Sequence, residues 1–182
     1  PLVEISKNDW NNYEISSDFK SSPLVNINQD NDLSKIYYFL RETFSELTSK
    51  VKSFEELNNS YHKMNYGLAD EVSIDVPIEE VTLTCNPAFR YGVNGTKGAR
   101  EARLKADTMT EFLSYAVACM FGRYSLDAPG LILANQGETL ADYLARIPEP
   151  SFMPDDDNVI PMIDFEGDWF EDDICERFKL FL

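Results

Sequence analysis

The sequence has few of the residues on which several common kinds of site depend. His62 is the only histidine, and the three cysteines, Cys85, Cys119 and Cys175, are widely spaced without a C-x-x-C pair. Disulfide frameworks and structural zinc sites use more closely organised cysteines, and Ser-His-Asp or Cys-His mechanisms need a positioned histidine. We therefore expect three reduced thiols in a cytoplasmic protein and a histidine at a surface or an interface.

Long apolar runs and basic residues are also scarce. No run approaches the roughly 18 apolar residues of a membrane span, and no signal peptide opens the chain, so no membrane partner is expected. Against 32 Asp and Glu there are 16 Lys and Arg, which gives a formal net charge of -16. Such a field repels DNA, so any contact with nucleic acid has to come from a local patch or from another part of a longer protein.

What is present indicates one folded domain. Hydrophobic residues make up 43% of the 182 positions and aromatic residues 13%, which disfavours disorder despite the charge. A chain of this length can bury roughly 70% of the surface that its unfolded form exposes. The chain starts at Pro1 without a Met and stops inside the apolar periodic stretch 178–182, so we expect a piece of a longer protein that is truncated at its C-terminal side.

The strongest periodic signal predicts a long amphipathic helix. Asp30 or Asp32 offers an N-cap and Gly67 a C-terminal stop, so the helix should run for about 32 residues and span about 48 Å at 1.5 Å per residue. Its apolar residues recur at alternating steps of four and three, with one slip after Phe54. They are Leu33, Tyr37, Leu40, Phe44, Leu47, Val51, Phe54, Leu57, Tyr61 and Met64.

Shorter elements flank this helix. Alternating or β-branched residues predict short strands at 2–5 and 76–84, and residues 131–134 could form a strand or a buried connector. Thr139-x-x-Asp142 predicts a small helix that ends before Pro148, and Asp168-x-x-Glu171 predicts the start of a last helix.

A second helix should end at Gly122 and approach the long helix through a stripe of small residues. That stripe comprises Ala99, Ala102, Ala106, Met109, Leu113, Ala116 and Met120. The predicted fold is mainly α, a helical bundle or spacer built on one long amphipathic helix with a few short β-strands. Residues 1–29 are expected to form an irregular segment, and residues 30–182 a helical domain.

Asn86-Pro87-Ala88-Phe89 resembles the Asn-Pro-Pro-Tyr or Phe loop with which amino-methyltransferases hold an extruded base. That loop combines an aromatic face with oxygen acceptors for the exocyclic amine. Here Ala88 replaces the second proline, and no cofactor loop lies upstream. We interpret the segment as a turn after a strand, with Phe89 packed inward.

One basic concentration stands out in the acidic chain. It comprises Arg90, Lys97, Arg100, Arg103 and Lys105. The loop Gly92-x-x-Gly95-x-x-Gly98 beside it matches neither a P-loop nor a dinucleotide fingerprint, and a flexible loop is the favoured interpretation, with a phosphate on the helix N-terminus as the alternative. Lys105 could pair with Glu101. The cluster is either a solvated face or a contact for the DNA backbone.

The segment from Glu149 to Glu176 is the most acidic part of the chain, with no Lys or Arg. A calcium loop that starts at Asp155 puts Val159 at a ligand position, and one that starts at Asp164 puts Gly167 too early. Solvated carboxylates explain the segment better. No catalytic, cofactor-binding or metal-binding residue is therefore assigned in this chain.

Four strings occur in a succession that resembles a known family. They are Asp9-Trp10-Asn11-Asn12-Tyr13-Glu14 with Ser17-Asp18-Phe19, then 113–127 with Pro129-Gly130, then 155–160 and 169–174. The succession is similar to the middle region of PglX, the adenine-specific DNA methyltransferase of type 1 BREX phage-defence systems. The most specific string runs from Leu113-Ser114-Tyr115 to Ser125-Leu126-Asp127.

This resemblance implies a parent enzyme that transfers a methyl group from S-adenosylmethionine to adenine N6 and so marks host DNA. In that family the catalytic and cofactor loops precede this region and sequence-reading modules follow it. The chain would then be a helical connector, inactive alone and without a cofactor of its own. Its partners would be DNA, through the parent protein, and other BREX proteins.

A second hypothesis is a free-standing acidic inhibitor that mimics DNA. The charge and the predicted rod would both suit it, but a mimic needs two rows of acids along its length, whereas these acids concentrate after Glu149. An independent enzyme is disfavoured because the necessary motifs are missing.

Overall fold

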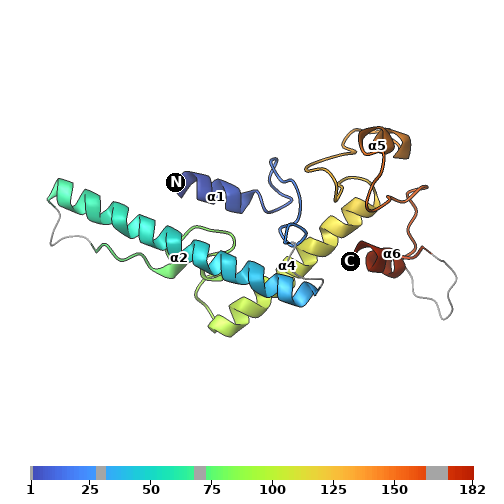
Figure 1. Ribbon diagram of the computed structural model, residues 1–182. Coiled ribbons are helices and arrows are strands. Elements are labelled where there is room, and N and C mark those ends of the chain that lie inside the picture. Colours follow the sequence, from blue (N-terminus) through green and yellow to red (C-terminus); the bar gives the residue numbers. More distant parts are fainter. Residues whose placement is uncertain (1, 28–31, 68–72, 163–171) are drawn as a thin grey trace.

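The computed structural model describes residues 2–27, 32–67, 73–162 and 172–182, and within these ranges the regular structure is helical (Figure 1). The mainly α prediction is confirmed. The strands expected at 2–5 and 76–84 are wrong, because the described residues contain six α-helices, one short 3-10 helix and no strand. No helix in the described ranges is both long enough and apolar enough to cross a membrane.

Helix α1 (Leu2–Trp10) stands where the first strand was expected. Leu2 and Ile5 both pack against the core, and their spacing of three residues suits one face of a helix better than one face of a strand. Near its end, buried Asp9 accepts hydrogen bonds from the backbone N–H groups of Thr84 (2.5 Å) and Cys85 (3.1 Å). These bonds fasten α1 to a loop 75 residues further along the chain.

Helix α2 (Leu33–Tyr66) is the predicted long helix, and its capping is confirmed at both ends. The Asp32 carboxylate accepts from Ser34 N at 2.8 Å, and Gly67 adopts the left-handed conformation with φ of 69°. Asp30, the other N-cap candidate, lies outside the described residues. The helix buries its first half, through Tyr37, Leu40, Phe44, Thr48 and Val51.

The chain after α2 returns along it without forming a strand. Lys52 Nζ contacts the Asp75 carboxylate (2.9 Å) and the Val76 carbonyl oxygen (2.5 Å), which holds the returning segment against the helix. A 3-10 helix, η1 (Ile78–Glu80), then follows Pro77. Alternating hydrophobicity misled the prediction here, because in the described chain no neighbouring strand exists with which this segment could pair.

Helix α4 (Lys97–Met120) confirms the second predicted helix and the turn at Gly122, whose φ is 69°. The predicted stripe is buried at its C-terminal end, at Ala116 and Met120, but it is wrong at its N-terminal end, where Ala99, Ala102 and Ala106 are exposed. The buried face also includes large side chains outside the stripe, which gain more from burial than alanine does. That face comprises Leu104, Thr108, Phe112, Tyr115, Ala116, Cys119 and Met120.

The last two helices pack near the C-terminal half of α4, away from the C-terminal end of α2 (Figure 1). Helix α5 (Leu140–Arg146) has the predicted Thr139–Asp142 capping box, and residues 131–134 form a connector that buries Ile132. Helix α6 (Ile174–Phe181) starts at the N-cap Asp173. Its predicted start at Asp168 and Glu171 lies outside the described residues.

Candidate nucleic-acid interface

The basic cluster lies on α3 (Pro87–Tyr91), the glycine loop and the first turns of α4. Asn86 caps α3, and Thr96 caps α4 by accepting a hydrogen bond from Ala99 N at 3.1 Å. Between the two helices Gly92 and Gly95 have φ of 72° and 87°, values that favour glycine and that let the chain turn sharply from one helix into the next. The two helices are in contact.

Arg90 is used inside this fold. Its guanidinium donates from Nη2 to Glu111 Oε1 at 2.7 Å and lies over the Tyr13 ring, with Cζ 5.2 Å from the ring centroid. Burial raises the pKa of Glu111, and the adjacent Arg90 opposes that rise. Arg90 therefore holds α3, α4 and the chain after α1 together rather than facing solvent as a free cation.

Arg100 and Lys97 differ in what they contact. Arg100 donates from Nη1 to the carbonyl oxygens of Val93 (3.2 Å) and Gly95 (3.1 Å), so it fixes the glycine loop. Lys97 is exposed at the first position of α4, beside that loop. A cation and the backbone N–H groups of a helix start thus lie at the same end of α4.

Arg103 and Lys105 point toward different neighbours. The Arg103 guanidinium lies 4.6 Å from the Tyr91 ring centroid on α3, whereas Lys105 Nζ lies 5.0 Å from the Tyr38 ring on α2. The expected pairing of Lys105 with Glu101 is not what the structure shows, because Glu101 binds Arg41 through two hydrogen bonds of 2.6 and 2.7 Å.

The five candidate residues therefore do not form one continuous patch. Arg90 and Arg100 serve the local fold, and Lys105 lies against Tyr37 and Tyr38 of α2. The exposed cations of the cluster are Lys97, at the start of α4, and Arg103, which lies over Tyr91 of α3. Tyr91, on which Arg103 lies, is itself oriented by a 2.7 Å hydrogen bond from its hydroxyl to Asp107.

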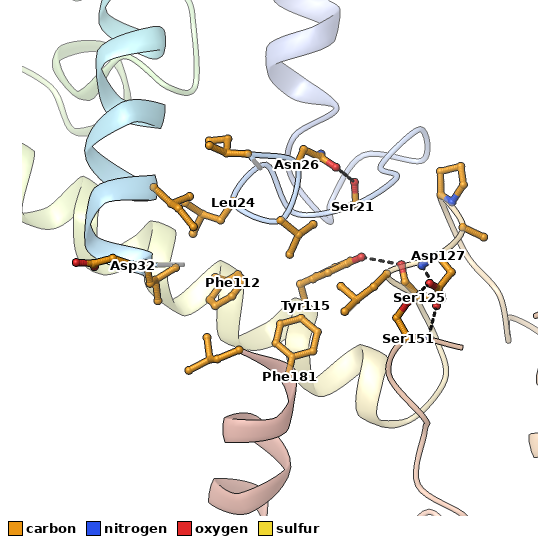
Figure 2. Close-up of a pocket in the computed structure, with 18 residues that line it drawn as sticks. Ser21, Leu24, Asn26, Asp32, Phe112, Tyr115, Ser125, Asp127, Ser151 and Phe181 are labelled. Carbon is orange, nitrogen blue, oxygen red and sulfur yellow. Dashed lines mark hydrogen bonds between the residues drawn. The ribbon is translucent and has the colours of Figure 1, made fainter. Parts of the chain in front are cut away.

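A separate cleft of about 1230 Å³ lies between residues 21–27, the start of α2, α4, the loop 125–129 and α6 (Figure 2). Phe112 and Phe181 form part of its apolar wall. The Tyr115 hydroxyl donates to Ser125 O at 3.0 Å, and Asp127 accepts from Ser151 N at 2.8 Å. The described residues that line this cleft include no Lys, Arg, His or Cys, and its Ser125 and Ser151 hydroxyls both donate to the Asp127 carboxylate.

Two of the three cysteines are buried, and one is exposed. All three are free thiols, as predicted, and burial raises the pKa of Cys85 and raises that of Cys119 to about 12. A thiolate is therefore strongly disfavoured at both buried positions at neutral pH. Cys175 and His62 are exposed, His62 as expected, and lie on different helices.

The chain is similar to two known adenine-specific methyltransferases. The adenine-specific methyltransferase BrxX of Escherichia coli O9:H4 (strain HS) is 33% identical over 183 residues, which cover 99% of this chain and 14% of BrxX. The adenine-specific methyltransferase PglX of Lacticaseibacillus casei (strain Zhang) is 30% identical over 188 residues, covering 100% of this chain and 14% of PglX. No protein-family model matches the chain.

The chain is a relative of the BREX PglX-type adenine-specific methyltransferases. It spans about one seventh of the length of the two curated relatives, since 14% of each is covered. The resemblance read from the sequence is thereby confirmed.

In this chain the Asn-Pro-Ala-Phe segment has a structural role. Asn86 is 2% exposed, its Nδ2 donates to the carbonyl oxygens of Ile78 (2.7 Å) and Val81 (2.9 Å), and its Oδ1 accepts from Ala88 N at 3.1 Å. Both amide protons are used, so they cannot orient a base. The expected inward packing of Phe89 is wrong, because this side chain is 44% exposed.

Sequence reasoning missed several side-chain contacts that organise this part of the chain. Arg41 interrupts the apolar stripe of α2 between Tyr37 and Phe44, and a charge at that place could have indicated a partly buried ion pair. The stacking of Arg103 on Tyr91 gave no sequence signal, because the two residues lie on different helices on either side of the glycine loop.

Proposed function

We propose that the chain is the helical connector of a longer, cytoplasmic, adenine-specific DNA methyltransferase that takes part in BREX phage defence. Residues 1–29 would lead out of the catalytic part, and residues 30–182 would form the connector toward the target-recognition part. This proposal is supported by the similarity to two such enzymes along essentially the whole chain. It is also supported by Asn86 of the Asn-Pro-Ala-Phe segment, whose side chain is hydrogen-bonded within the fold and caps α3.

The chemistry would belong to the rest of that enzyme. S-adenosylmethionine would bind there and supply the methyl group for adenine N6, and this chain would bind neither the cofactor nor a metal. Other BREX proteins would be partners of the assembled enzyme. A free-standing DNA mimic is not favoured, because the similarity to methyltransferases extends over 99% and 100% of the chain.

The connector would also contact the DNA backbone. Of the five basic candidates, Lys97 and Arg103 are exposed, Arg100 shapes the glycine loop, and Arg90 and Lys105 are held by other contacts. Cations that neutralise phosphates position a duplex without reading its sequence. Lys97 and Arg103 would therefore guide the DNA between the catalytic and recognition parts.

The test is the double variant Lys97→Glu with Arg103→Glu in the full-length methyltransferase. DNA affinity should fall to a similar degree for specific and unrelated sequences, and the slope of log affinity against log salt should fall by about two, one for each cation. Binding is measured at several salt concentrations.

Lys20→Glu with Lys179→Glu is the matched control, because both lysines are exposed and lie outside α3 and α4. This control changes the net charge equally and should leave the slope near that of the unmodified enzyme. An unchanged slope in the Lys97 and Arg103 variant would overturn the proposed DNA contact.

A further inference from the structure

The distal part of α2 carries large apolar side chains that nothing in the described chain covers. Leu57, Tyr61 and Met64 are 68%, 65% and 80% exposed. They follow one another at steps of four and three, so they form one ridge along the helix. In Figure 1 this end of α2 projects away from α5 and α6.

The ridge is exposed because the apolar stripe of α2 turns around the helix. Val51 is 2% exposed and faces the core, and Leu57 follows it by six residues. At about 100° per residue, six residues place Leu57 about 120° around the axis from Val51. The returning segment near Asp75 and Val76 binds Lys52, which precedes Leu57 by five residues on the helix.

The surroundings of the ridge differ from the rest of the chain in charge. Residues 57–67 contain no Asp or Glu, although the whole chain has 32 of them, and Lys63 is their one charged side chain. Protein interfaces are depleted of charge at their centres and enriched in Tyr and Met. An amphipathic helix with anchors at i, i+4 and i+7 binds by laying that face into an apolar groove.

We infer that the ridge of Leu57, Tyr61 and Met64 docks into an apolar groove, bordered by carboxylates near Lys63, on another part of the same methyltransferase polypeptide. This inference rests on the proposed function, in which most of the enzyme lies outside these 182 residues. The relatives support it, because the matched region is 14% of each. Two copies of this chain, each with a charge of -16, would repel one another, and apolar side chains do not suit phosphates.

Photo-crosslinking in the full-length methyltransferase tests the contact. Tyr61 is replaced by p-benzoylphenylalanine, and the products are mapped by mass spectrometry. The expected product is a crosslink within one polypeptide to a segment outside these 182 residues. Tyr66 is the matched control site, because it is 72% exposed and lies five residues along, on another face of the same helix end. Its yield of that product should be about tenfold lower.

Two further variants separate docking from general disturbance. Leu57→Glu with Met64→Glu, in the Tyr61-substituted enzyme, should lower the crosslink about tenfold or more, because it removes two apolar anchors. Asn58→Glu with Asn65→Glu adds the same charge at the same spacing, one residue along, and should leave the crosslink in place.

A crosslink to a second copy, a crosslink to bound DNA, a crosslink only within these 182 residues, or no product would each overturn the inference. None of these outcomes depends on the salt slope of the Lys97 and Arg103 variant. Failure of the docking inference can therefore be told apart from failure of the proposed DNA contact.

Discussion

Single buried polar side chains hold the irregular parts of this chain in place. Asp9 binds two backbone N–H groups of the loop before α3, and Asn86 binds two carbonyl oxygens around η1 and one N–H of α3. Each replaces backbone partners that a sheet would otherwise have supplied. The segment that alternates like a strand is thus stabilised by side chains rather than by a neighbouring strand.

Replacing Asn86 tests whether this segment is a scaffold or a base-binding loop. Asn86→Ala removes three hydrogen bonds from a buried residue, two of them to carbonyl oxygens that would then keep only one backbone donor each, so the free energy of unfolding should fall by about 2–3 kcal/mol. Chemical denaturation measures the loss. In the full-length methyltransferase, the rate of methyl transfer per folded molecule should not change.

Asn86→Ser is the matched control, because a serine oxygen can still accept from Ala88 N but cannot reach both carbonyl oxygens. Its effect should be intermediate. A large fall in methyl transfer with unchanged stability would instead assign Asn86 to the reaction.

At the scale of the helices, the sequence predicted the helix ends, which depend on local hydrogen bonds, but not the buried face of α4, which depends on packing against distant residues. Asp32, Gly67 and the Thr139–Asp142 box act within one turn of the chain, and each caps the predicted helix. The buried face of α4 depends on which partners reach it, and these come from α6 and from residues 19 and 124. No periodicity within α4 contains that information.

The long helix offers a direct comparison of a covered and an uncovered half. Val51 is 2% exposed and Leu57 is 68% exposed, although the sequence places both on the apolar stripe. Val51→Asp should lower the free energy of unfolding by about 3–5 kcal/mol, because it buries an unpaired charge. Leu57→Asp should change it by no more than about 0.5 kcal/mol in the 182-residue chain. Urea denaturation followed by circular dichroism measures both, and equal effects would contradict the exposure of the distal ridge.

For the whole molecule, the sequence revealed the family relation but not the geometry of the basic cluster. The cluster residues are close in sequence, yet Arg103 faces Tyr91 and Lys105 faces Tyr37 and Tyr38. Helical rotation separates two residues that are two positions apart by about 200°. The sequence spacing would allow Glu101 to pair with Lys105. In the structure α2 and α4 cross, and Glu101 pairs with Arg41 of α2 instead.

The same acidic composition makes the stability of the chain depend on pH, and the hydrogen-bonded carboxylates set the direction. Glu138 accepts from Asn135 N and Ala134 N, both at 2.8 Å, and pairs with Arg146. These contacts, the Asn135 N–H first, lower the pKa of Glu138 from 4.5 to about 2. Burial raises the pKa of Glu55 instead.

Glu138 and Glu55 should therefore affect stability with opposite signs. The unfolded chain binds a proton at Glu138 more readily than the folded chain, so the stabilisation from Glu138 is present above about pH 4.5 and is lost as pH falls toward about 2. Glu138→Gln should lower the melting temperature at pH 7, and its curve should meet that of the unmodified chain near pH 2. Glu55→Gln is the matched control: the charge of Glu55 is disfavoured in the folded state, so this variant should raise the melting temperature at pH 7. Calorimetric melting between pH 7 and pH 2 compares the three proteins. If both variants shifted the curve in the same direction, the loss of one negative charge from a chain of -16, rather than the local contacts, would govern the acid response.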